Sequence, residues 1–359
     1  MPHQRLTLSL GYDVVLAGDF AGLQGELQAC LPGSTRALVV THPRIRGWHG
    51  AAIEAELSGV EITWLEVPEG EAHKSLETWR GLVARMLEAR PDRQVPVLAL
   101  GGGVVGDMAG FAAATVLRGL PFVQIPTSVL AAVDASVGGK TAVNVPQGKN
   151  LVGAFYQPRL VWAPLSTLDT LPPEELRCGL GEIVKHAIIA GGDALSRLEA
   201  SGLDLLAGDK GALATVIADS VRVKAAIVER DPLERGERAI LNLGHTLGHA
   251  VESVLGYGAV RHGEAVAIGI VAIARLGVLR GWTCAGVASR VEALVGRLDL
   301  PTRVPTGAST DDLHAAMGFD KKRARGMVRL VVFSEPGKVR LESLPEAELR
   351  ALAELGVRA

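Results

Sequence analysis

Short apolar runs alternate with amphipathic segments along the first half of the chain. The apolar runs cover residues 36–41, 60–67, 95–100 and 122–126, and each is followed by a segment whose apolar positions have helical spacing. Alternation of short strands with helices is typical of βαβ units, which build a mostly parallel sheet. The first half therefore predicts an α/β domain.

The pattern changes near residue 171. Residues 172–175 (Pro-Pro-Glu-Glu) have the composition of a helix start, and long helical periods rich in Ala, Leu and Val follow to about Leu298. Because a chain of 359 residues exceeds what one hydrophobic core usually organises, we expect two domains. They are predicted as an α/β domain over residues 1–170 and a mainly helical domain over residues 171–359.

A small hairpin is predicted near the end of the chain. Residues 328–333 and 338–341 are rich in strand-forming side chains, and Glu335-Pro336-Gly337 between them has turn chemistry. A last helix is expected from Pro345.

Composition and charge exclude several classes of protein. The chain has 37 Lys and Arg against 39 Asp and Glu, a net charge of −2, so it has no general attraction to nucleic acid or to an anionic membrane. Cys30, Cys178 and Cys284 are widely spaced and form no C-x-x-C motif, which argues against a disulfide framework or a thiolate metal site. The N-terminus lacks an apolar signal core, and no apolar stretch of membrane-spanning length is free of charge. We therefore expect a soluble, cytoplasmic protein.

A glycine-rich turn follows the third apolar run. Residues 95–100 lead into Gly101-Gly102-Gly103, and residues 104–117 have a helical pattern. Backbone amides at a helix N-terminus can bind a pyrophosphate. The spacing departs from G-x-G-x-x-G, and such turns also serve packing alone, so both interpretations stay open.

A second glycine-rich stretch carries lysines. It runs from Gly138-Gly139-Lys140 to Gly148-Lys149-Asn150, and the flanking glycines predict turns at Lys140 and Lys149. Glycine allows a ligand to approach the backbone closely, and lysine suits a phosphate or a carboxylate, although an exposed or salt-bridged lysine is the simpler alternative. A P-loop needs glycine where Asp134 stands, which disfavours a nucleoside triphosphatase. The two stretches together predict a nucleotide and an anionic substrate side by side.

Histidines and a glutamate in the second half suggest a metal site. His245 and His249 stand one helical turn apart, so both can face one side of a helix. A zincin would have glutamate directly after the first histidine, where Thr246 stands, which disfavours a metalloprotease. His262 follows farther along, and Glu182 stands in an apolar helical segment. Two imidazoles and one carboxylate with an open position form a donor set that suits catalytic Zn²⁺, while hydrogen-bonded core histidines are the alternative.

A set of ordered segments, taken together, closely resembles the 3-dehydroquinate synthase family of NAD-dependent, zinc-containing cyclases in the shikimate pathway. The resemblance covers nearly the whole chain and implies a Rossmann-like NAD-binding domain, a helical metal- and substrate-binding domain and an active site in the cleft between them. Its most specific segments are residues 101–119, 133–158, 179–185, 242–252, 262–269 and 320–322.

The resemblance also implies a role for individual residues. The implied ligands of the metal, Zn²⁺ or Co²⁺, are Glu182, His245 and His262, whereas spacing alone would pair His245 with His249. The implied NAD-binding residues are Glu71, Lys74, Gly102, Gly103, Asp107, Thr127, Ser128, Lys140, Lys149 and Thr170. The implied substrate-binding residues are Arg118, Lys149, Asn150, Lys224, Arg238 and one of Lys321 and Lys322, and the implied catalytic residues are Asp134, Lys140, Lys185, Asn242 and His249.

Several positions bear on assembly or depart from the family pattern. The family residue that matches Arg118 reaches into the site of the neighbouring subunit, which implies a homodimer. His42 stands near the expected adenosine ribose, where Asp or Asn is common. Ser128 replaces a usual threonine, and Gly181 replaces a common alanine.

The implied reaction converts 3-deoxy-D-arabino-heptulosonate 7-phosphate to 3-dehydroquinate and phosphate. Bound NAD⁺ oxidises the substrate, phosphate is eliminated, the hydride returns and an aldol step closes the ring, so NAD is recycled in each turnover. Asp134 and His249 are candidates for proton transfer. The alternatives are another sugar-phosphate cyclase, a metal- and NAD-dependent polyol dehydrogenase, and a ligand sensor without catalysis. The lysines at the matched positions disfavour a polyol substrate, which needs no such charge.

Overall fold

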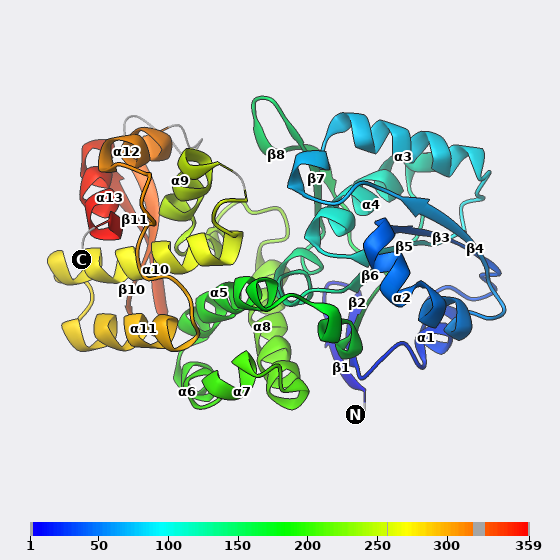
Figure 1. Ribbon diagram of the computed structural model, residues 1–359, viewed down its shortest axis with the longest axis horizontal. Coiled ribbons are helices and arrows are strands. Elements are labelled where there is room, and N and C mark those ends of the chain that lie inside the picture. Colours follow the sequence, from blue (N-terminus) through cyan, green and yellow to red (C-terminus); the bar gives the residue numbers. More distant parts are fainter. Residues whose placement is uncertain (1–2, 257, 319–326, 358–359) are drawn as a thin grey trace. The chain divides into compact units, whose positions relative to one another are not determined.

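The computed structural model describes residues 3–256, 258–318 and 327–357 (Figure 1). The chain forms two compact units, Met1–Pro172 and Pro173–Ala359. Each unit has its own core and is described by itself.

The first unit is built on a seven-stranded sheet with the order β1-β2-β9-β6-β5-β3-β4. Only β1 and β2 pair in antiparallel fashion, and every other neighbouring pair in this sheet is parallel. The mostly parallel sheet confirms the α/β class. Its strands are β1 (Gln4–Leu8), β2 (Tyr12–Ala17), β3 (Arg36–Thr41), β4 (Glu61–Glu66), β5 (Val97–Gly101), β6 (Phe122–Pro126) and β9 (Leu160–Pro164).

Helices cover both faces of this sheet. Helices α1 (Leu23–Cys30) and α2 (Pro43–Glu56) contribute to one apolar cluster, and α3 (Leu76–Glu88) and α4 (Gly103–Thr115) contribute to the other. Strand β5 contributes to both clusters: Leu98 and Leu100 belong to the first cluster, whereas Val97 and Ala99 belong to the second. Successive side chains of a strand point to opposite faces, so a strand buried on both faces is apolar throughout.

A two-stranded hairpin, β7 (Lys140–Val145) and β8 (Gly148–Phe155), corrects one expectation. We expected Lys140 and Lys149 in turns, but Lys140 begins β7 and Lys149 is the second residue of β8. The positive φ angles of Gly138 (99°) and Gly139 (65°) confine the turn to the residues before Lys140. The strand follows because Thr141, Ala142 and Val143 are buried and suited to a sheet.

The second unit is mainly helical and ends in a hairpin. Its helices are α5 (Pro173–Ala190), α6 (Gly192–Ala200), α7 (Gly202–Leu206), α8 (Lys210–Arg230), α9 (His245–Leu255), α10 (His262–Leu279), α11 (Ala285–Arg297), α12 (Thr310–Gly318) and α13 (Leu349–Val357). The predicted hairpin is present as β10 (Met327–Glu335) and β11 (Lys338–Pro345), and it is longer than the sequence pattern suggested.

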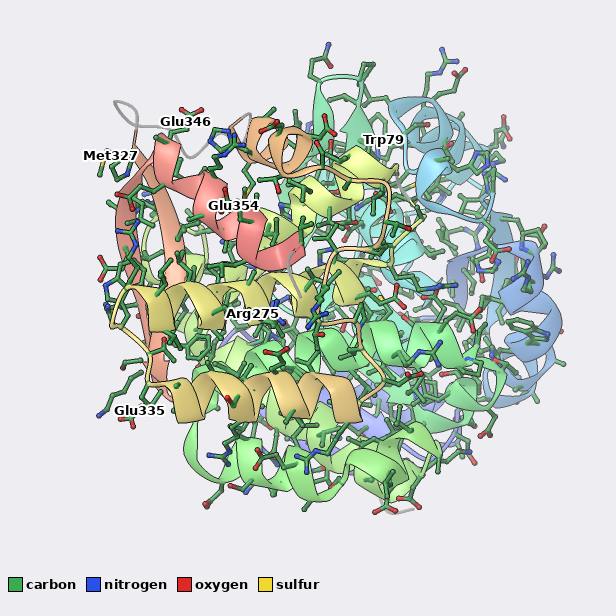
Figure 2. All side chains as sticks on the ribbon, turned by 60° about the vertical axis from the view of Figure 1, so that its left-hand side comes forward. Trp79, Arg275, Met327, Glu335, Glu346 and Glu354 are labelled. Carbon is green, nitrogen blue, oxygen red and sulfur yellow. The ribbon has the colours of Figure 1, made fainter. Side chains whose placement is uncertain are left out.

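Helix α10 is the core helix of this unit. By length and composition it could cross a membrane, with a mean hydropathy of 1.6, but 72% of its 18-residue window is buried inside the protein. It lies between α11 and α13 (Figure 2). Arg275 of α10, labelled in Figure 2, joins all three helices: it donates to Glu292 of α11 at 2.6 Å and to the carbonyl of Leu355 in α13 at 2.8 Å.

Candidate active site

Three side chains from separate helices converge in the second unit. Glu182 comes from the middle of α5, His245 is the first residue of α9 and His262 is the first residue of α10. One ligand atom from each lies within 4.8 Å of those of the other two. Glu182 Oε1 is 3.7 Å from His245 Nε2 and 3.4 Å from His262 Nε2. We call these residues the Glu182 cluster.

Close helix packing positions this cluster. A Cβ on Gly181 would lie 2.1 Å from the carbonyl oxygen of Gly263, and a Cβ on Gly263 would lie 1.7 Å from the carbonyl oxygen of Cys178. Real side chains cannot approach backbone so closely, so α5 and α10 meet through glycine. Gly181, which has no side chain, fits this contact. The approach brings Glu182 beside the first residue of α10.

The ring nitrogens of both histidines have distinct partners. His245 Nδ1 is 3.1 Å from the carbonyl oxygen of Leu243, and His262 Nδ1 is 3.1 Å from Glu252 Oε2. In the neutral form of each ring, an Nδ1–H donated to these oxygens leaves Nε2 with its lone pair, and Nε2 is the ring atom close to Glu182 in both cases. The cluster therefore offers two nitrogens and a carboxylate to one point.

The electrostatics of the cluster differ between the two rings. Glu182 is fully buried and forms an ion pair with Lys185, one turn farther along α5. Burial, together with the nearby Lys185 ammonium, holds the pKa of His245 well below its usual range. Burial alone would also lower the pKa of His262, but hydrogen bonds to Glu182 and Glu252 outweigh it and raise the pKa to about 10. A cation bound here must displace the His262 proton, so binding is coupled to proton release.

The donor set and its spacing fit a divalent transition metal. Nitrogen and oxygen ligands about 2.0–2.1 Å from a tetrahedral zinc ion stand roughly 3.3 Å apart, close to the separations found in the Glu182 cluster. Three protein ligands leave a fourth position for a substrate oxygen. A second group of possible ligands, His249, Glu252 and His262, also lies within 4.8 Å of one another, but His249 is exposed.

Cationic side chains of the second unit are unusually buried. Lys185 is 1% exposed, Lys224 of α8 is 7% exposed and Arg238 is 2% exposed. Arg238 and Asn242 belong to the short helix η5 (Glu237–Asn242), and η5 and α8 both pack against α5. Buried Lys and Arg are rare unless they are paired or bind an anion.

His249 lies on α9, whereas Lys321 and Lys322 lie outside the described residues.

Several predicted cofactor residues of the first unit lie at the carboxyl end of the sheet. Gly102 and Gly103 follow β5, and Thr127 and Ser128 follow β6, while Gly101 pairs with Pro126 across these two strands. Ligands of open α/β sheets bind at the carboxyl ends of the strands, and α4 begins here, where the backbone amides of a helix's first turn can bind an anion. Thr170 ends the short helix η4 (Leu165–Thr170), which follows β9. Its hydroxyl is 3.0 Å from His49 Nε2 of α2.

A hydrogen-bond network joins predicted cofactor and substrate residues. The Lys74 ammonium donates to Asp107 Oδ2 at 2.6 Å and to Asn150 Oδ1 at 2.5 Å. Asn144 donates to Glu71 Oε1 at 2.7 Å and accepts from the Asn150 amide at 2.9 Å. Glu71 belongs to the short helix η1 (Glu71–His73), Asp107 to α4, and both asparagines to the hairpin. The network thus links three segments that are distant in sequence.

The other predicted residues of this unit lie in irregular backbone. Arg118 ends the short helix η2 (Val116–Arg118), and both Leu117 and Arg118 have positive φ angles, 50° and 65°. Two successive residues other than glycine in this region are uncommon and mark a strained turn. Asp134 lies in a single π-helical turn, η3 (Ala131–Ala135). His42 precedes α2, and burial lowers its pKa.

Sequence reasoning gave no role to Glu252 or Asn144. The signal for Glu252 was present, because His245, His249 and Glu252 recur at intervals of four and three residues, which places them on one face of α9. For Asn144 there was no comparable signal, since its partners stand far away along the chain.

The fold and the site define an α/β unit followed by a helical unit with a candidate metal centre. A family model described as the N-terminal part of 3-dehydroquinate synthase matches residues 64–178, and one described as the C-terminal part matches residues 179–323. The chain therefore belongs to the 3-dehydroquinate synthase family, which confirms the resemblance seen in the sequence.

Individual relatives support this membership. A 3-dehydroquinate synthase from Symbiobacterium thermophilum is 47% identical over 326 residues, which cover 89% of this chain and 91% of that protein. A 3-dehydroquinate synthase from Pelobacter propionicus is 42% identical over 359 residues, which cover 98% and 99%. Among solved structures, the 2-epi-5-epi-valiolone synthase from Streptomyces hygroscopicus, with NAD⁺ and Zn²⁺ bound, has a TM-score of 0.87 and 29% identity, covering 98% of each chain.

Proposed function

We propose that the protein converts 3-deoxy-D-arabino-heptulosonate 7-phosphate to 3-dehydroquinate and phosphate in the cytoplasm, using catalytic NAD and a divalent metal. The observation that carries this function is the alignment with curated 3-dehydroquinate synthases over nearly the full chain, 98% in one case. The reaction belongs to the shikimate pathway, which supplies the aromatic amino acids.

We assign the metal to the Glu182 cluster and NAD to the carboxyl end of the sheet in the first unit. When bound, the cation lowers the pKa of a ligated hydroxyl, and NAD⁺ accepts and returns a hydride. The solved relative that binds NAD⁺ and Zn²⁺ supports the use of both groups. Zn²⁺ or Co²⁺ suits two imidazoles and a carboxylate.

The protein's own groups bind the substrate and move its protons. Lys185, Lys224 and Arg238, all nearly excluded from solvent, provide strong electrostatic attraction to the carboxylate and the phosphate. His249, exposed on α9 beside the cluster, carries an imidazole that can act as a general acid or base, and Asp134 is the second candidate for proton transfer. His249 remains available for this role when the metal is held by Glu182, His245 and His262.

A phosphate-release assay tests the function. The purified protein, supplied with NAD⁺ and Zn²⁺, should release phosphate from the heptulosonate phosphate while absorbance at 340 nm stays constant. Release only from sedoheptulose 7-phosphate or from a hexose 6-phosphate would indicate another sugar-phosphate cyclase instead. Net accumulation of NADH would indicate a dehydrogenase.

We also propose that the enzyme is a homodimer in which Arg118 serves the site of the neighbouring subunit. Its position in a strained turn supports a role beyond packing. Two inactive variants, Arg118→Ala and His262→Ala, should regain activity when they are unfolded and refolded together, because a mixed dimer contains one intact site. Sedimentation would establish the dimer. A monomer, or mixtures that stay inactive, would contradict the proposal.

A further inference from the structure

We propose that Glu252 is a positioning residue that fixes the tautomer of His262 and so presents its Nε2 atom to the bound cation. The proposal rests on the metal site assigned above. Glu252 Oε2 is 3.1 Å from His262 Nδ1, while Glu182 Oε1 is 3.4 Å from His262 Nε2. The imidazole ring therefore lies between two carboxylates, one at each nitrogen.

The burial of Glu252 supports a dedicated role. Its side chain is only 7% exposed, although carboxylates are rarely buried without a function or a partner. It lies on α9, which packs against α10, so the bond to His262 crosses between two helices. A carboxylate that accepts from the outer ring nitrogen fixes the orientation of a metal-binding imidazole and raises its basicity.

The two histidines of the cluster receive this support in different ways. His245 Nδ1 lies 3.1 Å from the carbonyl oxygen of Leu243, a neutral backbone acceptor. For His262, the acceptor at Nδ1 is instead the carboxylate of the Glu252 side chain. An ionised acceptor forms a stronger hydrogen bond than a neutral carbonyl. We therefore expect the orientation of His262 to depend on one side chain, Glu252, whereas the orientation of His245 depends on the backbone.

A competing role for Glu252 is direct ligation together with His249 and His262. In that arrangement a cation would sit at Nδ1 of His262 rather than at Nε2. The Glu182 cluster is favoured because the Nε2 atoms of His245 and His262 lie within 3.7 Å of one fully buried carboxylate oxygen. Direct ligation makes a different prediction: replacing His249 would then weaken metal binding as much as replacing Glu252.

Zinc affinity, measured by competition with a chromophoric chelator, tests the proposal without relying on turnover. Glu252→Gln should bind Zn²⁺ about 10- to 100-fold more weakly than the wild type, whereas Glu252→Asp should lose less because it keeps a charged acceptor. Glu264→Gln is the matched control, since Glu264 lies in the first turn of α10 but accepts from the Arg261 amide. Its zinc affinity, and that of His249→Ala, should stay within about twofold of the wild type.

A spectroscopic measurement separates positioning from folding. In zinc-loaded protein with ¹⁵N-labelled histidine, the signals of His262 should show a protonated Nδ1 and a metal-bound Nε2. In Glu252→Gln the Nδ1–H signal should shift or exchange faster, while circular dichroism and NAD affinity remain unchanged. Wild-type zinc affinity in a normally folded Glu252→Gln would overturn the proposal, as would an equal loss in His249→Ala. Phosphate release by the wild type is a separate result, so failure of the proposed function would not be mistaken for failure of this inference.

Discussion

The ammonium group of Lys74 lies 2.6 Å from the carboxylate of Asp107, and the two side chains are only 5% and 17% exposed. Lys74 follows η1 and Asp107 lies in the helix that begins at the glycine-rich turn, so the ion pair fixes one segment against the other. A buried pair of this kind is sensitive to the loss of either partner, because the remaining charge stays in a poorly solvated position.

Replacing Lys74 with Met should therefore affect both stability and cofactor binding. We expect the free energy of unfolding to fall by about 3 kcal/mol, and NAD affinity to fall with it. Urea denaturation and calorimetry with NAD would measure the two effects. Lys338→Met is the control, since Lys338 and Glu335 form a largely exposed pair in the last hairpin. Equal stability of the two variants would contradict the importance of the Lys74 pair.

Replacing Lys185 with Met should separate substrate binding from cofactor binding. Lys185 is almost fully buried beside Glu182 in the second unit, whereas all of the predicted NAD-binding residues lie in the first. Affinity for the sugar phosphate should fall by at least about 100-fold, the loss expected when a bound charge loses a buried, ionised partner, and NAD affinity should change little. Calorimetry with each ligand would test this. Equal losses for the two ligands would show that Lys185 supports the fold rather than the substrate.

Replacing glycine with alanine should be harmful in the contact between α5 and α10 and harmless at an open position elsewhere in the same unit. Gly263→Ala should destabilise the protein by about 1–3 kcal/mol and weaken zinc binding, because a methyl group would meet the Cys178 carbonyl. Gly286→Ala, in α11, should be neutral or slightly stabilising, because nothing lies within 4 Å of its Cβ position. Thermal unfolding and zinc competition would compare them. Unchanged zinc affinity in Gly263→Ala would mean that the close approach does not position the cluster.

Two of the three cysteines, Cys178 and Cys284, should differ in reactivity. Burial raises the pKa of the Cys178 thiol from 9.0 to about 12, while Cys284 is exposed. Because the thiolate is the reactive form, iodoacetamide should modify Cys284 first and leave Cys178 intact up to about pH 10. The Cys178 thiol ionises more readily in the unfolded chain than in the folded one. The free energy of unfolding should therefore fall as the pH rises from about 9 to about 12. Mass spectrometry of peptides after timed alkylation would show the order, and early labelling of Cys178 would contradict it.

The sequence predicted most of the sheet because β3, β4, β5 and β6 are apolar runs bounded by turn residues. It missed β1, β2 and β9, since no helical segment separates β1 from β2 or β8 from β9, so these strands fall outside the strand–helix alternation that revealed the others. The hairpin β7–β8 was taken for turns because of its glycine content. Its register depends on partners elsewhere in the fold, such as the bonds of Asn144 to the Lys74 segment.

The candidate site shows the same limit of local patterns. Spacing paired His245 with His249, one turn apart, because only neighbours along a helix are visible in a sequence. His262 enters the cluster through the packing of α9 and α10, and Glu182 enters through the glycine contact of α5 with α10. Because those contacts are tertiary, spacing along the sequence could not reveal that His262 and Glu182 join His245, and only the resemblance to a family implied this set of ligands.

The most direct test of the account is anomalous diffraction at the zinc absorption edge from crystals of the zinc-loaded protein. We predict one strong peak about 2.0–2.2 Å from Glu182, His245 Nε2 and His262 Nε2, with Glu252 bonded to the other nitrogen of His262. A peak held by His249, Glu252 and His262, or no peak near Glu182 in an enzyme that binds zinc, would contradict it.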